Sequence, residues 1–389
     1  MASEGLHGKA IAAARIFDGE RWHEESALVV DDGGHVTAIV PAGALPETAD
    51  RTDLGDGMVV PGFVDLQVNG GGGVLFNDAP TVDSIAAICR AHARFGTTAL
   101  LPTLITDTPE VGRSAVTAAI DAARVKIPGF LGLHLEGPHI ALERKGVHDP
   151  ALIRPMRPAD FQLLEEAAAS VPVLVMTAAP ETVPPEDIAR LRGRGIHVSL
   201  GHSNASYDLA RRASEAGASL VTHIFNAMSP LAHRDPGMVG NALENGALHV
   251  GLIGDGVHVD PAAIRIALRA KRGPGHVFLV TDAMSPIGTD MATFTLNGRT
   301  IYRRDGRLTL ADGTLAGADI DMMASVRFMH ETVGVPLDEV LRMASLYPAR
   351  AIGMDREIGH LKPGARASFA HVGTDLAIGG VWIDGRPAA

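Results

Sequence analysis

Hydrophobic and polar positions define eight apolar runs between residues 59 and 282, most of which end in polar or Gly-rich residues. Amphipathic segments with helical spacing, such as Val82–Phe95 and Pro261–Lys271, lie between most of them. Strands alternating with helices predict a parallel sheet, and eight such units favour a closed α/β barrel of the (β/α)8 TIM type over a doubly wound open sheet. The runs are Val59–Gly70, Thr98–Thr103, Phe130–His139, Val173–Thr177, Ile196–Leu200, Ser219–Ile224, His249–Ile253 and Val277–Asp282.

Shorter strand-like runs flank the predicted barrel on both sides. Near the beginning they are separated by Asp-Gly turn signals, and strand-like composition returns near the end of the chain. A few short strands need a partner to be stable, so we expect both termini to form one small β-sandwich. The predicted domains are therefore residues 1–57 and 356–389 for the sandwich, and 58–355 for the barrel. We also predict a hairpin inserted after the eighth strand, from Phe294–Ile301 and Arg307–Leu310.

Composition and charge narrow the possible partners. The 389 residues are 46% hydrophobic and 20% charged, which leaves ample material for a core. The net charge of −11 argues against nucleic-acid binding, because phosphate backbones require clustered Lys and Arg. A single cysteine, Cys89, excludes an intramolecular disulfide and is typical of a reducing cytosol. The chain has no long apolar run and no export signal, so we expect a cytoplasmic protein that does not bind membranes.

Polar residues suited to cation binding end three of the apolar runs. His134 and Glu136 point the same way from a strand because side chains alternate, and a Gly-Pro pair then ends that strand. A buried, unpaired carboxylate at this tip would cost on the order of several kcal/mol. His202 and His223 end two later runs. One Glu and two His form a metal-ligand set with open positions for water, whereas His134, one step deeper, is interpreted as a core residue.

Other polar residues leave more than one interpretation open. Asp282 ends the eighth run, where a carboxylate beside a metal would accept a proton from water; a structural carboxylate or a helix N-cap is the alternative. His148 and His258 lie in predicted loops and could contact substrate or solvent. The glycines Gly70–Gly73 lack the Lys-Ser/Thr of a phosphate loop, so close backbone packing is the preferred interpretation.

Six motifs now allow a family resemblance to be stated. The first, Val60–Asp65, resembles the strand that opens the barrel in the amidohydrolase superfamily. The other five resemble, in order along nearly the whole chain, the N-acetylglucosamine-6-phosphate deacetylase family. They are Leu133–Pro138, Gly201–Ala205, Thr222–Met228, Asp255–His258 and Val280–Ala283.

The resemblance implies hydrolysis of the acetamide of N-acetyl-D-glucosamine 6-phosphate to D-glucosamine 6-phosphate and acetate. It implies that Glu136, His202 and His223 bind the metal, that Asp282 is the general base and that His148 polarises the amide carbonyl. It also implies a homodimer in which Arg234 reaches the phosphate in the neighbouring active site. The residues implied in sugar-phosphate binding are Val147, Asn226, Ala227, Arg234, Asp255, His258, Leu315, Ala316 and Gly317.

One departure concerns the number of metal ions. The first barrel strand usually ends in His-x-His in this superfamily, whereas this chain has Gln67-Val-Asn69. Carboxamides bind transition metals more weakly than imidazoles do, and a branch of the family shares this pair. We therefore expect one divalent ion, zinc, with iron, cobalt or manganese as alternatives. Another amidohydrolase reaction, a cyclic amidase or deaminase, and a non-catalytic barrel scaffold are the competing hypotheses.

Overall fold

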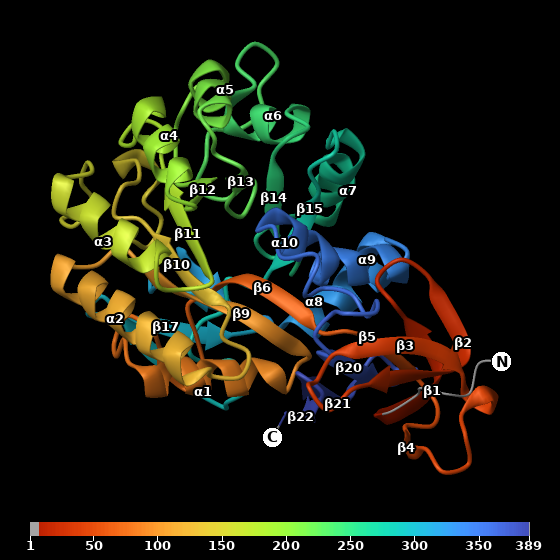
Figure 1. Cartoon of the computed structure of the whole chain (residues 1–389). Helices are drawn as coiled ribbons and strands as arrows, with labels where there is room; N and C mark the ends of the chain where they lie inside the picture. The colour runs from red at the N-terminus through yellow and green to blue at the C-terminus, as the bar shows by residue number, and fades with distance from the viewer. Residues whose placement is uncertain (1–7, 389) are drawn as a thin grey trace.

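Eight parallel strands form a barrel in this computed structural model, which describes residues 8–388 (Figure 1). Each strand pairs with the next along the chain, and each overlaps one of the eight predicted apolar runs. Residues 1–7 and 389 of the predicted domain ranges lie outside the described residues. The barrel strands are β6 (Phe63–Val68), β9 (Thr97–Ile105), β10 (Gly132–Glu136), β11 (Val173–Ala178), β12 (His197–Leu200), β13 (Leu220–Val221), β14 (His249–Ile253) and β15 (Val277–Val280).

The barrel closes where its first strand, β6, meets its last strand, β15. The Asp282 N–H donates to the Gln67 carbonyl at 3.0 Å, just beyond the end of β15. Deeper in this seam, the buried Asp65 carboxylate accepts hydrogen bonds from the Thr281 hydroxyl at 2.5 Å and the Thr281 N–H at 3.2 Å. Closure therefore brings the Gln67-Val-Asn69 segment next to Asp282.

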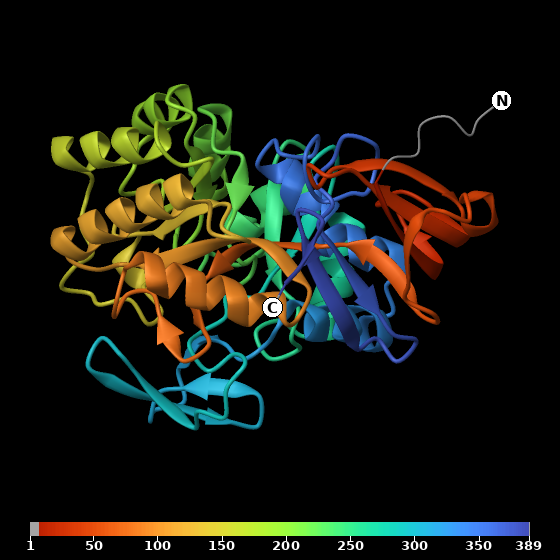
Figure 2. The same ribbon diagram turned by 60° about the horizontal axis from the view of Figure 1, so that its bottom comes forward.

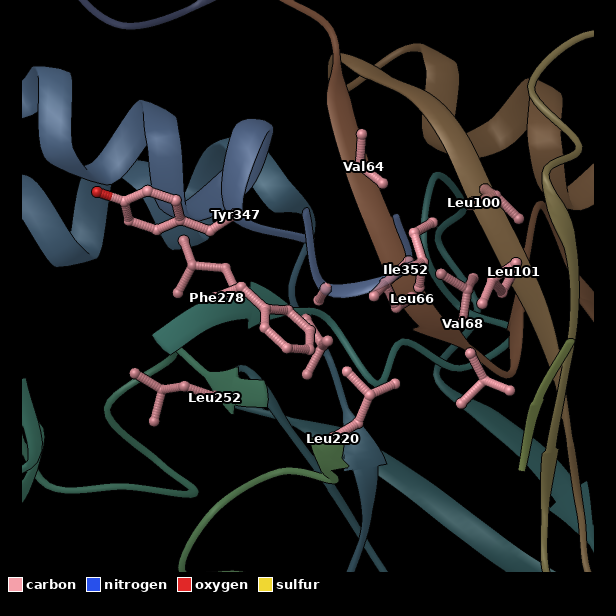
Figure 3. Packing of buried hydrophobic residues seen from close by; sticks show 14 of the residues in the cluster. Val64, Leu66, Val68, Leu100, Leu101, Leu220, Leu252, Phe278, Tyr347 and Ile352 are labelled. Atoms are coloured by element: carbon pink, nitrogen blue, oxygen red, sulfur yellow. The ribbon is translucent and has the colours of Figure 1, made fainter. Parts of the chain in front are cut away.

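Apolar side chains from the barrel strands and from the segments packed around them form a continuous buried core (Figure 3). Val64, Leu66 and Val68 come from β6, and they are almost completely buried together with Leu220 and Phe278 from later strands. Burying such aliphatic and aromatic side chains contributes about 1.5–3 kcal/mol each. The core thus gives the strand ends a rigid support.

Helices cover the outside of the barrel (Figure 1). Polar residues cap several of them: Thr81, Thr108 and Asp260 accept backbone N–H bonds in the first turns of α1, α2 and α7. Pro261, as the first residue of α7, lacks the N–H that would have no partner there. The helices that follow the barrel strands are α1 (Val82–Ala93), α2 (Pro109–Val125), α3 (Pro158–Ala168), α4 (Pro185–Gly193), α5 (Tyr207–Glu215), α6 (Gly237–Glu244) and α7 (Pro261–Ala270).

A second eight-stranded sheet joins the two ends of the chain beside the barrel (Figure 1). The link is made by β5, which pairs with β1 and with β20, so that Met58 faces Val372 and Pro61 faces Phe369. With this sheet, the predicted barrel with a β domain from both termini is confirmed. Its strands are β1 (Lys9–Phe17), β2 (Trp22–Val30), β3 (Val36–Pro41), β4 (Asp50–Asp53), β5 (Met58–Pro61), β20 (Phe369–Val372), β21 (Ile378–Ile383) and β22 (Arg386–Pro387).

A four-stranded antiparallel sheet is inserted after β15, where a hairpin was predicted (Figure 2). The difference arises at Asn297 and Gly298, which turn the chain between β16 and β17 with positive φ angles of 49° and 71°. The inserted sheet consists of β16 (Thr293–Leu296), β17 (Arg299–Arg304), β18 (Arg307–Thr309) and β19 (Leu315–Ala318). After it come α8 (Met322–Arg327), a π-helical turn (Phe328–Val333), α9 (Leu337–Ala344) and α10 (Leu346–Ala351). Two short strands, β7 (Gly70–Gly71) and β8 (Val74–Leu75), and the 3-10 turns Ala42–Ala44 and Leu142–Arg144 complete the elements.

Candidate active site at the barrel mouth

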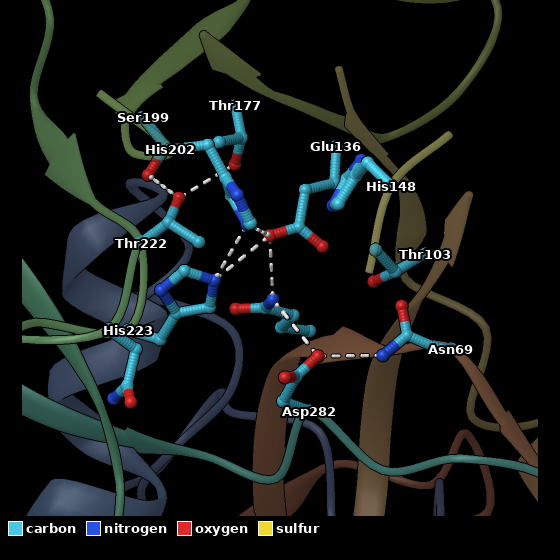
Figure 4. A network of polar contacts seen from close by, with 12 residues as sticks. Asn69, Thr103, Glu136, His148, Thr177, Ser199, His202, Thr222, His223 and Asp282 are labelled. Carbon is cyan, nitrogen blue, oxygen red and sulfur yellow. Dashed lines mark hydrogen bonds and ion pairs between the residues drawn. The ribbon is translucent and has the colours of Figure 1, made fainter. Parts of the chain in front are cut away.

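Three side chains from different strand ends converge at the mouth of the barrel (Figure 4). The Glu136 Oε1 atom lies 3.1 Å from His202 Nε2 and 3.1 Å from His223 Nε2. The two Nε2 atoms are also 3.1 Å apart, and all three side chains are buried. Three potential ligand atoms so close together could share a single cation.

The backbone bends sharply at three of the residues that define this site. His202, His223 and Asp282 each lie two residues beyond the last residue of their strands, β12, β13 and β15. Their φ angles are 47°, 29° and 51°, in the left-handed region that non-glycine residues rarely adopt. Such a conformation costs about 1–2 kcal/mol per residue and is concentrated at functional sites.

The hydrogen bonds of His202 prepare it to bind a metal. Its Nδ1 lies 2.8 Å from the Arg144 carbonyl, which can only accept, so Nδ1 carries the proton and Nε2 presents its lone pair. Burial alone would raise the pKa of Glu136, but the adjacent rings of His202 and His223 outweigh the effect of burial and hold that pKa well below its usual value. An ionised carboxylate and an imidazole lone pair fit a divalent cation.

A second set of possible ligands, Glu136, His148 and His202, has its donor atoms within 4.8 Å of one another. The hydrogen bonds of His148 decide between the two sets. The Thr106 N–H lies 3.3 Å from His148 Nδ1, and because an N–H can only donate, the proton of the neutral ring is on Nε2. Burial also lowers the pKa of His148 to about 3, which keeps the ring neutral. His148 therefore presents an N–H donor to the site, which leaves His223 as the candidate third ligand.

The opposite side of the mouth is built from amides and a carboxylate (Figure 4). The Asp282 Oδ1 atom accepts from Asn69 Nδ2 at 2.6 Å and from Gln67 Nε2 at 3.2 Å. Gln67 Nε2 also lies 3.1 Å from Glu136 Oε1, so one amide contacts both carboxylates. Burial, followed by repulsion from Glu136, raises the pKa of Asp282 to about 6.

Two kinds of contact in this site, from side-chain amides and from backbone groups, were not foreseen from the sequence. Gln67 and Asn69 were considered only as weak ligands, although their alternation with Asp65 placed three polar side chains on one face of a buried strand. The Arg144 carbonyl and the Thr106 N–H are backbone groups, for which no residue type gives a signal. His134 has both nitrogens occupied, by the Leu66 carbonyl at 2.9 Å and the Thr177 hydroxyl at 2.8 Å, as expected for a core residue.

The residues predicted to bind the sugar phosphate come from several loops and from β19. His258 Nδ1 lies 2.6 Å from Asp255 Oδ2, in a buried pair. The Ser203 N–H donates to the Ala227 carbonyl at 3.1 Å, which fixes the segment after His223. The backbone of β19, which contains Leu315, Ala316 and Gly317, reaches Asp282 through the Ala318 N–H. Asn226 and Val147 are partly buried, whereas Arg234 is exposed in the loop 230–236.

A cavity of about 790 Å³ lies elsewhere, between α1, α2 and the C-terminal strands. Cys89, Lys126, Arg366 and Arg386 line it, and it contains none of the predicted site residues. Cys89 itself is a free, buried residue of α1. The chemistry of the strand ends, rather than the volume of a cavity, therefore locates the candidate active site.

The fold and these side chains define a TIM-barrel hydrolase with a candidate metal centre at the C-terminal ends of its strands. Residues 58–388 match the model of the amidohydrolase family. The chain belongs to the amidohydrolase family.

Relatives with similarity over nearly the full length make the comparison more specific. An N-acetylgalactosamine-6-phosphate deacetylase from a Shewanella species is 39% identical over 96% of this chain and 94% of its own length. An N-acetylglucosamine-6-phosphate deacetylase from Haemophilus influenzae is 36% identical over 92% of this chain and 93% of its own. The crystal structure of the N-acetylglucosamine-6-phosphate deacetylase from Pasteurella multocida has a TM-score of 0.93, at 38% identity, over 97% of this chain and 99% of that one.

None of the helices within residues 8–388 has both the length and the apolar character that crossing a membrane requires.

Proposed function

We propose that the protein hydrolyses the acetamide of N-acetyl-D-glucosamine 6-phosphate, releasing D-glucosamine 6-phosphate and acetate. The observation that carries this proposal is the meeting of Glu136, His202 and His223 within 3.1 Å of one another, with Asp282 and His148 beside them. The full-length similarity to deacetylases of 6-phosphorylated amino sugars supports the choice of substrate.

Glu136, His202 and His223 would hold one divalent metal ion, for which zinc is our proposal. A cation bound there supplies Lewis-acid activation of water and of the acyl oxygen. Zinc accepts this mixture of nitrogen and carboxylate ligands, as do iron, cobalt and manganese. Elemental analysis of the purified protein, followed by activity after chelation and reloading with each ion, tests the proposal.

Asp282 would act as the general base and then as the general acid. Its Oδ1 is held by Gln67 and Asn69, while its Oδ2 makes no hydrogen bond with a described residue and could take a proton from the attacking water. A pKa of about 6 keeps the carboxylate ionised at neutral pH, yet basic enough to accept this proton. Asp282 would then transfer the proton to the leaving amine of the sugar.

His148 would stabilise the negative charge that develops on the acyl oxygen. Its neutral ring directs an Nε2–H donor into the site, because Nδ1 accepts from Thr106. A donor of this kind, positioned before the reaction, is worth about 3–4 kcal/mol in the transition state.

The phosphorylated sugar would lie among the loops around the metal centre. The proposed contacts come from Val147, Asn226, Ala227, Asp255, His258 and the segment 315–317. Arg234, on an exposed loop, would contact the phosphate in the neighbouring subunit of a homodimer. The Arg234→Ala variant should lose preference for the phosphorylated over the unphosphorylated sugar, and sedimentation of the wild-type protein should give the mass of a dimer.

One assay separates this function from the alternatives. Acetate release is measured from N-acetylglucosamine 6-phosphate with metal-loaded and with chelated protein. Release that requires the metal supports the proposal. No release, combined with turnover of a cyclic amide or an aminated base, would identify another amidohydrolase reaction, and no turnover of any of these would indicate a scaffold.

A second candidate substrate is N-acetyl-D-galactosamine 6-phosphate, the C4 epimer. The specific observation in its favour is the 39% identity to a Shewanella relative named for this activity. The ratio of kcat/KM for the two epimers, measured in the same assay, decides between them. In either case we propose a cytoplasmic enzyme of amino-sugar metabolism.

A further inference from the structure

A short loop, residues 144–148, supplies several groups to the candidate active site. The Arg144 carbonyl fixes the Nδ1–H of His202, and His148 itself faces the same centre. The rings of His148 and His202 are 4.5 Å apart, so a shift of this loop would move both. Thr106 holds only the Nδ1 edge of His148, at 2.7 Å from its hydroxyl, which leaves the backbone before His148 to be fixed by other contacts.

The inserted sheet provides such a contact. The guanidinium of Arg299, the first residue of β17, donates a hydrogen bond to the carbonyl of Val147, the residue immediately before His148. The Val147 side chain packs against the apolar face of the same sheet, which includes the buried residues Leu296 and Ile301. Thus one polar and one apolar contact join the sheet to the loop.

The same sheet is also attached to the other side of the mouth. The Ala318 N–H, at the end of β19, donates to the Asp282 carbonyl at 3.0 Å. Arg303 binds the Asp319 carboxylate at 2.7 Å and the Thr289 carbonyl at 2.7 Å, which fixes β17 to its flanking segments. The inserted sheet therefore spans the mouth from Asp282 to the loop that carries His148, with Arg299 at its outer contact.

We propose that Arg299 is a positioning residue, which holds the Val147 carbonyl and thereby directs the Nε2–H of His148 at the acyl oxygen of the substrate. This inference rests on the proposed function, because it assigns Arg299 a role in that reaction. An arginine suits the role, since its planar, permanently charged guanidinium can fix a carbonyl in one direction. A displacement of about 1 Å in a catalytic group can cost roughly 100-fold in rate.

The test is a double-mutant cycle between Arg299 and His148. Arg299→Met keeps an unbranched side chain but removes the donors, and Arg299→Lys retains a donor. We expect Arg299→Met to lower kcat roughly 10- to 100-fold with KM changed less than about threefold, and Arg299→Lys to recover most of kcat. In the His148→Ala background, Arg299→Met should reduce kcat by less than about twofold, because the group that it positions is gone.

Arg304→Ala is the matched control, because Arg304 is an exposed arginine on the same strand. It should leave kcat unchanged, and thermal melts of all variants should show that the fold is retained. If Arg299→Met lowers kcat equally with and without His148, or lowers only the melting temperature, the positioning role is wrong. If the wild-type protein releases no acetate, or His148→Ala has no effect, the proposed function fails instead, so the two failures are distinct.

Discussion

The two sides of the barrel mouth contain different chemistry although they lie within hydrogen-bond distance of each other. On one side, β12 and β13 direct imidazoles at Glu136, whereas on the other, β6 directs the amides of Gln67 and Asn69 at Asp282. Imidazole lone pairs bind a cation, while amide N–H groups bind a carboxylate. The difference fits our proposal that one side holds a metal and the other a proton acceptor.

Gln67 joins the two sides. Its Nε2 atom contacts both Glu136 and Asp282, so it occupies a position where a cation could otherwise have bridged the carboxylates. Two buried carboxylates repel each other, and this repulsion adds to burial in raising the pKa of Asp282. The amide reduces this repulsion with hydrogen bonds instead of a second positive ion.

Removing an imidazole should produce the largest effect. His202→Ala and His223→Ala each eliminate one of three proposed ligands, so metal content and turnover should fall together, the latter by roughly 10³-fold or more. Elemental analysis and acetate release measure both quantities. His35→Ala is the control, because His35 is an exposed histidine far from the site residues in sequence. It should change neither the metal content nor the turnover. Full metal content in either site variant would remove that residue from the ligand set.

Changing the proton acceptor should separate the two sides. Asp282→Asn should lower turnover by about 10²- to 10⁴-fold while the metal content stays at the wild-type level. The reason is that the amide cannot accept a proton, whereas the imidazole side is left intact. Metal loss in this variant would make Asp282 a ligand, and near-normal turnover would remove its role as base.

Replacing the Gln67 and Asn69 amides by imidazoles should give both sides of the mouth residues that can bind a metal. In the double variant Gln67→His and Asn69→His, two imidazoles would stand beside Glu136 and Asp282, which could bind a second cation. The metal content should rise from about one to about two equivalents per chain by the ligand count. Asn245→His, on a distant loop, controls for nonspecific binding by an added histidine. An unchanged metal content would show that side-chain identity alone does not decide how many ions bind.

The smallest effect should be on the pH dependence of protein stability, through Asp65 in the seam between β6 and β15. Burial raises the pKa of Asp65 to about 7. At any pH between the ordinary pKa of an Asp and about 7, the folded protein therefore keeps a proton on Asp65 that the unfolded chain releases. The native state then holds more protons, and stability falls as the pH rises through this interval. Asp65→Asn should remove this dependence, shifting the melting temperature by a few degrees, most at neutral pH.

Melting curves from pH 4 to 8 for the wild type and Asp65→Asn measure this difference. Asn can accept the Thr281 and Gln67 N–H bonds and donate to the Thr281 hydroxyl, so the substitution fits the seam. Parallel pH profiles for the two proteins would contradict a raised pKa for Asp65.

The barrel could be predicted from the sequence because buried strands and amphipathic helices give different spacings of hydrophobic residues. All eight strands overlap apolar runs, since a strand buried on both faces needs a continuous apolar segment. The strand-end position of Glu136 followed from alternation and from the Gly-Pro pair. The roles of His202 and His223 came from a family resemblance as well as from their position, because a lone histidine has many uses.

What the sequence did not predict depends on contacts between distant segments or on backbone groups. The hydrogen bonds to the Arg144 carbonyl and from the Thr106 N–H decide the tautomers of two histidines, yet any residue type could supply them. The donation from Gln67 to two carboxylates depends on closure of the seam between β6 and β15. The inserted sheet was predicted as a hairpin because the Asn297-Gly298 turn was placed inside one strand.

The left-handed backbone at His202, His223 and Asp282 has a consequence for protein engineering. Glycine adopts this conformation without penalty, so glycine at any of the three should relieve about 1 kcal/mol of strain in the metal-free protein. A library selected only for heat resistance would therefore be enriched in barrels that have lost their ligands or their base. Screens on this scaffold should score turnover and survival together.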